Sequence, residues 1–275
     1  MIADVWSRDL LLLPLLLGLA ALLCSTSTAA AEEKPAPEQL DLAVAKVQQL
    51  LRSADSLAAA EFLEAEGEPK AVGQRYYRVM NDLYWKRHDL PGLITVARLG
   101  IHYCVSRAQG APEAEAAELR GLGKTMAYDL ASFTWPGWND AGIHPTPADE
   151  ATGLDAARLN LRLAMQLKRG AAPMSNAHWL LGAQQLAAGQ FAGALHSFEH
   201  SAEFARQDKN RGAELMAQGY GILTRSLEGK SPDAEKELRA NAEALVKEKD
   251  GEFFRDQIET ARKVFAARFK TSDRK

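Results

Sequence analysis

Apolar residues recur every three or four positions through most of this chain, and that spacing constrains the fold more than any other feature. It is the spacing of one face of an α-helix, whereas a half-buried strand would alternate apolar and polar residues. One segment, 159–163, does alternate, but it lies within a stretch of good helix formers. We therefore predict an all-α fold. The stripes place helices at 40–51, 71–88, 90–107, 112–133, 149–169, 176–188, 191–206, 211–227, 233–249 and 252–269.

The composition is that of an ordinary globular protein, with 47% apolar and 25% charged residues. The formal net charge of −3 leaves no surplus of Lys and Arg, so we expect no nucleic-acid partner. Two cysteines cannot form a disulfide framework, and stability must come from helix packing. Cys104 lies in an apolar helical stretch, where a buried and inert thiol is expected.

The N-terminal segment has the pattern of a targeting signal. Residues 10–23 are leucine-rich, and small residues follow them up to Ala31. This pattern is typical of a secretory signal peptide at 1–31, cleaved after Ala31, although Arg8 is the only basic residue before the apolar run and an uncleaved anchor is the alternative. We expect an exported protein, periplasmic or secreted, without a membrane span after cleavage. The expected order is signal peptide 1–31, flexible linker 32–39, a single helical-repeat domain 40–270 and a polar tail 271–275.

The expected helices fall into pairs, and one pair has a recognisable pattern. Equivalent starts in two successive pairs, Ala177 and Gly212, are 35 positions apart. The pair at 175–208 resembles a tetratricopeptide repeat, whose period is about 34 residues. The residues that carry the resemblance are Leu181, Gly182, Gly189, Phe191, Ala194 and Phe198. It implies that two helices approach closely where Ala194 faces Gly182 and that the chain turns at Gly189, in a TPR-like helix-pair solenoid. An irregular right-handed helical array is the alternative.

The resemblance also implies where a partner would bind. In tetratricopeptide proteins the first helices of the pairs line a concave surface, which takes up a protein or peptide. On helix 176–188 the residues expected on that surface are Asn176, Trp179, Ala183 and Leu186. Trp85 and Trp179 are also large enough to serve as core residues.

The loop 134–147 is the second candidate for binding. It carries Trp135 and Trp138, which could stack on a sugar or a peptide, with Asn139, Asp140 and His144 as polar partners. The alternative, which we favour, is that both tryptophans fasten the loop to the helices.

Two short motifs suggest catalysis but have little support. His196 to His200 spells His-x-x-Glu-His, the inverted zinc-peptidase motif, yet these histidines are expected on the exposed side of a helix and no third ligand is apparent. Gly121 to Thr125 resembles part of a phosphate loop, but it lies within a helix, where Lys124 is expected to be a solvated charge.

We therefore expect an exported scaffold or adaptor that binds a protein or peptide, with no catalytic residue, cofactor or metal. Two alternatives stay open. One is an envelope enzyme, either a zinc peptidase at the His-x-x-Glu-His segment or a carbohydrate-active protein that uses the Trp135–Trp138 loop. The other is a structural component of an envelope assembly.

Overall fold

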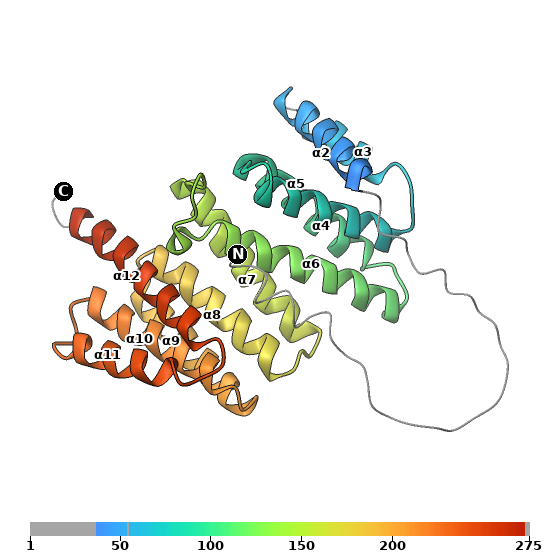
Figure 1. Ribbon diagram of the computed structural model, residues 1–275. Coiled ribbons are helices and arrows are strands. Elements are labelled where there is room, and N and C mark those ends of the chain that lie inside the picture. The colour runs from blue at the N-terminus through green and yellow to red at the C-terminus, as the bar shows by residue number, and fades with distance from the viewer. Residues whose placement is uncertain (1–36, 54, 273–275) are drawn as a thin grey trace, which may run out of the picture. The chain divides into compact units, whose positions relative to one another are not determined.

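The computed structural model describes residues 37–53 and 55–272 (Figure 1). The expected signal peptide, most of the expected linker and the end of the polar tail lie outside these residues. The described residues form eleven α-helices and one short 3-10 helix, η2, and contain no strand, which confirms the all-α prediction. None of these helices is both long and apolar enough to cross a membrane. The elements are α2 Pro37–Arg52, α3 Ser56–Glu64, α4 Pro69–Trp85, α5 Leu90–Arg107, α6 Glu113–Phe133, η2 Pro136–Trp138, α7 Pro147–Gln166, α8 Ala171–Ala187, α9 Phe191–Gln207, α10 Arg211–Leu227, α11 Ala234–Leu245 and α12 Gly251–Ser272.

Each helix packs mainly against the next one along the chain, so the helices form a consecutive array. In addition, α4 contacts α6, α6 contacts α8, α8 contacts α10, and α10 contacts α12. Alternate helices therefore stack on one another, as in an array of helix pairs. The core consists of apolar faces buried between these layers.

The helix boundaries follow from local chemistry. Asp89 caps α5, because its side chain accepts a hydrogen bond from the Gly92 backbone N–H at 3.0 Å. Thr146 and Asp149 form a capping box at the start of α7, and the ambiguous segment 159–163 lies inside that helix. The helix-forming residues around the segment thus outweigh its short alternation.

Most turns between helices use a residue with positive φ. Gly189 has φ +70° between α8 and α9, the turn that the sequence predicts. His88, Lys168, Lys209 and Asp250 also have positive φ, although side chains disfavour this conformation. Backbone N–H groups in these turns donate hydrogen bonds to the last carbonyl groups of the preceding helix. At the Lys209 turn, the N–H of the following residue, Asn210, donates to Ala205 O at 2.9 Å.

The pair α8 and α9 packs as closely as its glycine allows. A Cβ atom at Gly182 would lie 2.8 Å from ring carbons of Phe198, which is closer than real Cβ contacts. Ala194 and Phe198 are both buried. The close approach at Gly182 is therefore present, but the nearest atoms belong to the Phe198 ring and not to Ala194, which the prediction placed there.

Two local expectations differ from the structure. Helix α3 was not expected, because its nine residues form too short a pattern to distinguish from a loop. Asp55 starts it by accepting a hydrogen bond from Ala58 N at 2.7 Å. Trp85 was expected in the core but is 40% exposed at the end of α4.

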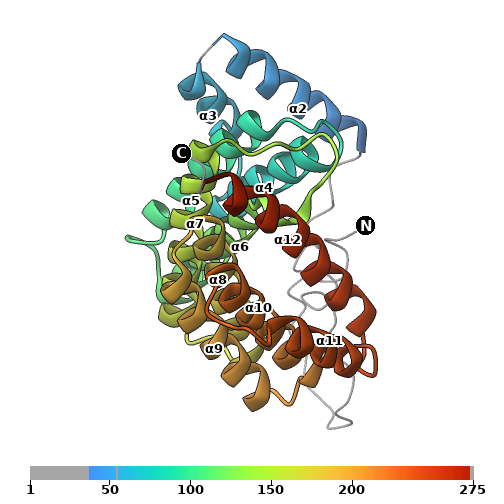
Figure 2. The same ribbon diagram turned by 90° about the vertical axis from the view of Figure 1, so that its left-hand side faces the viewer.

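The last helix, α12, turns back over the array (Figures 1 and 2). It contacts α10, α11 and η2. Its Phe265 is fully buried, and its Arg268 forms an ion pair with Glu150 of α7 at 2.8 Å. Helix α12 therefore joins segments that lie far apart in the sequence.

Candidate binding site

The residues expected to line a surface on α8 are mostly in the core. Trp179 is 1% exposed, Ala183 and Leu186 are fully buried, and Asn176 is half-buried. The reason is that the loop after α6 and helix α10 cover this face: the Trp179 ring lies 5.8 Å from the Trp135 ring and 5.5 Å from the Tyr220 ring, centroid to centroid. The expectation of an accessible surface at Trp179, Ala183 and Leu186 is thus corrected.

The loop tryptophans fasten the loop to the helices, which agrees with the interpretation that we favoured. Trp135 and Trp138 are 2% and 9% exposed, and their rings meet edge to face at 4.8 Å. The Trp135 indole N–H donates to Ala183 O at 2.9 Å, and that of Trp138 donates to Ser132 O at 2.8 Å. Other protein groups therefore occupy the ring faces that a sugar would need.

The polar loop residues do not form a common site. Asn139 has φ +54° and is exposed, as is His144. Asp140 accepts a hydrogen bond from the Tyr84 hydroxyl of α4. Burial, with a further contribution from Asp140, raises the pKa of Tyr84 well above its usual range. Asp140 therefore links the loop to α4.

A polar cluster between α4 and α6 is the strongest candidate for a binding site. It consists of Tyr77 and Asn81 on α4 and Lys124, Tyr128 and Asp129 on α6, all partly exposed. Tyr77 and Asn81 interact with the Asp129 carboxylate. The Lys124 Nζ lies 5.7 Å from the centre of the Tyr128 ring. We refer to this cluster as the α4–α6 recess.

Burial shifts the pKa values of two ionisable side chains of the recess, Asp129 and Lys124. Burial raises the pKa of Asp129 to about 7, although hydrogen bonds from Tyr77 and Asn81 and the charge of Lys124 oppose the change. Burial and the nearby Arg169 lower the pKa of Lys124. Both side chains are still partly exposed to solvent. Lys124, which was expected to be a solvated charge, is partly exposed and lies close to the Tyr128 ring.

Sequence reasoning did not identify the α4–α6 recess. Its members lie on two helices about fifty residues apart, and only the fold brings them together. One signal was present: Lys124 and Tyr128, which are four positions apart, share a helical face. A solvent-exposed helix face without any binding role has the same spacing, so this signal does not identify a site.

The histidines of the His-x-x-Glu-His segment lie on α9. His196 is exposed and His200 partly exposed, as expected, and their Nε2 atoms are 3.2 Å apart. His178 of α8 stacks on Phe204 and lies 5.1 Å from His200, centroid to centroid. Burial, together with the charges of His200 and His196, lowers the pKa of His178 to about 4. Within residues 37–53 and 55–272, no three His, Cys, Asp or Glu side chains gather closely enough to hold a metal ion.

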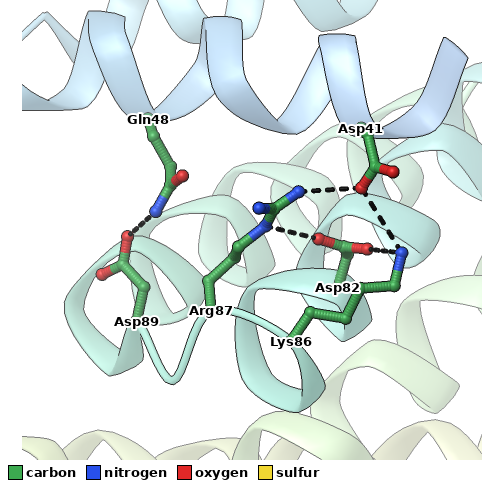
Figure 3. Close-up of polar contacts among 6 residues, drawn as sticks. All are labelled: Asp41, Gln48, Asp82, Lys86, Arg87 and Asp89. Carbon is green, nitrogen blue, oxygen red and sulfur yellow. Dashed lines mark hydrogen bonds and ion pairs between the residues drawn. The ribbon is translucent and has the colours of Figure 1, made fainter. Parts of the chain in front are cut away.

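A charged network attaches α2 to the turn between α4 and α5 (Figure 3). The buried Asp82 carboxylate lies 2.7 Å from Lys86 Nζ and 3.2 Å from Arg87 Nε. Asp41 of α2 reaches the same two cations, at 2.8 Å from Arg87 and 3.4 Å from Lys86. Since the charges pair within the network, its role is structural.

A second contact in Figure 3 completes this attachment. Gln48 of α2 donates to Asp89 at 2.9 Å, and Asp89 also caps α5.

Cys104 is a buried free thiol on α5, and burial raises its pKa to about 12, as expected of an inert cysteine.

Comparison with models of known protein families gave no match, and no curated protein matched the chain. The interpretation of function therefore depends on the geometry described above.

Proposed function

We propose that this chain is an exported, TPR-like helical-repeat protein that binds a protein or peptide partner in the α4–α6 recess. The observation that carries the proposal is the cluster of partly exposed tyrosine, asparagine, lysine and aspartate side chains between α4 and α6. Export is supported by the leucine-rich segment and the small residues that precede Glu32. The pairing of helices and the motif at 175–208 support the TPR-like assignment.

The side chains of the recess suit a polypeptide ligand. Tyr77 and Tyr128 present an apolar ring and a polar hydroxyl, a combination that is enriched at protein interfaces. Asn81 offers both a donor and an acceptor to a peptide backbone. Lys124 is already partly desolvated by burial. Its further desolvation on binding a partner therefore costs less free energy than the desolvation of a fully exposed lysine.

The test is selection of peptides from a random library against the purified chain, followed by affinity measurement with variants. Lys124→Ala should weaken the selected peptides at least about tenfold, as expected of a residue at the centre of an interface. Lys263→Ala, at an exposed position on α12, is the matched control and should leave affinity unchanged.

Two outcomes would contradict the proposal. The first is a peptide that binds wild type, Lys124→Ala and Asn81→Ala equally well. The second is an uncleaved chain that remains in the cytoplasm on cell fractionation, which would exclude export. The two measurements test the binding site and the compartment separately.

A further inference from the structure

We propose that His196 and His200 form a two-histidine binding site for a divalent transition-metal ion. Both residues lie on α9 and are four positions apart, so their side chains share one helical face. Their Nε2 atoms are 3.2 Å apart. With metal–nitrogen bonds of about 2.0–2.1 Å, two ligands of a tetrahedral ion lie about 3.3–3.4 Å apart, and adjacent ligands of a square-planar ion about 2.9 Å. The observed separation falls between these values.

The same distance permits a hydrogen bond between the two rings, and this contact places both nitrogens correctly for a metal. One ring nitrogen must donate and the other must accept, so the two Nε2 atoms face each other across the gap between the rings. When a metal ion binds, the proton of the donor ring moves from Nε2 to Nδ1, so both Nε2 lone pairs can coordinate the ion and the two neutral rings release no net proton. The pair therefore needs little rearrangement to become a chelate.

The surroundings of the pair support a metal ion bound at the surface. Glu203 Oε2 lies 4.0 Å from His200 Nδ1, which is beyond hydrogen-bond distance but places a negative charge beside the pair. His178 lies next to His200, but its ring stacks on Phe204. Because the described residues provide no group of three ligands, water completes the coordination of the ion. Such a site binds Zn²⁺, Ni²⁺ and Cu²⁺, with Cu²⁺ the tightest.

The site is separate from the α4–α6 recess, so the two proposals fail or succeed independently. The test is calorimetric titration of the full chain, without an affinity tag, with Cu²⁺ and with Zn²⁺. Wild type should bind one equivalent of each ion. His196→Gln and His200→Gln should each weaken binding about a hundredfold, because the second imidazole acts at a high effective concentration. His102→Gln, an exposed histidine on α5, is the matched control and should bind as wild type does.

A second measurement locates the bound ion. Substoichiometric Cu²⁺ should broaden the imidazole NMR signals of His196 and His200 before those of His88, His102 and His144. Equal affinity of wild type and the His196→Gln/His200→Gln double variant would overturn the proposal. A loss on His178→Gln that exceeds the loss on His200→Gln would overturn the assigned pair. Circular dichroism of each variant shows that the helices are retained.

Discussion

At the scale of single residues, Asp129 makes stability depend on pH. Its pKa is about 7, above the ordinary value of 3.8, so the folded chain binds this proton more tightly than the unfolded chain does. Stability from this group is therefore highest below pH 4 and falls as pH rises towards 7. We expect Asp129→Asn, which cannot ionise, to raise the free energy of unfolding at pH 8 by about 1–2 kcal/mol, a value discounted for solvent contact.

The measurement is denaturant unfolding of both proteins at pH 5 and at pH 8. The gain from Asp129→Asn should be smaller at pH 5, because the wild-type carboxyl is already protonated there. Asp208→Asn changes an exposed carboxylate and serves as the control, with no pH-dependent gain. A gain of equal size at both pH values would show that ionisation of Asp129 is not its cause.

At the scale of elements, the turn at Lys209 is strained. This lysine has φ +60° between α9 and α10. A residue with a side chain in this conformation destabilises the folded state by about 1–2 kcal/mol. Glycine removes this strain, but it also makes the unfolded chain more flexible, which offsets part of the gain in stability. We expect Lys209→Gly to stabilise the protein by about 0.5–1 kcal/mol in thermal unfolding. Lys46→Gly, in the exposed middle of α2, should instead destabilise it by about 1 kcal/mol.

At the scale of the whole molecule, Trp135 connects the loop, α8 and α12. Its indole N–H bonds to Ala183 O, and its ring contacts Phe265 of α12. We expect Trp135→Phe to lower the free energy of unfolding by about 1–3 kcal/mol, through the lost hydrogen bond and the cavity left behind. Trp85→Phe, at an exposed position, should cost less than about 1 kcal/mol. Similar losses for the two variants in chemical denaturation would show that Trp135 does not have this connecting role.

The sequence predicts local features of this fold better than distant contacts. The turn at Gly189 and the close approach at Gly182 each depend on neighbouring residues or on one adjacent helix. The burial of Trp179 depends on Trp135 and Tyr220, which come from the loop after α6 and from α10 and which no local pattern places against α8. The interaction of Tyr77 with Asp129 likewise requires that α4 and α6 stack, so the α4–α6 recess could not be located from the sequence.

The ion pair between Glu150 and Arg268 has a consequence for folding kinetics. It joins positions 118 residues apart, whereas most helices contact their immediate neighbours along the chain. Contacts between adjacent helices form rapidly, and folding can nucleate in any helix pair. Helix α12 can dock only after α7 and η2 have reached their positions, because its contacts are with these distant segments. We therefore expect the segment from α7 to α12 to open as one cooperative unit in native-state hydrogen exchange, and α2 and α3, which make fewer contacts, to exchange earlier and separately.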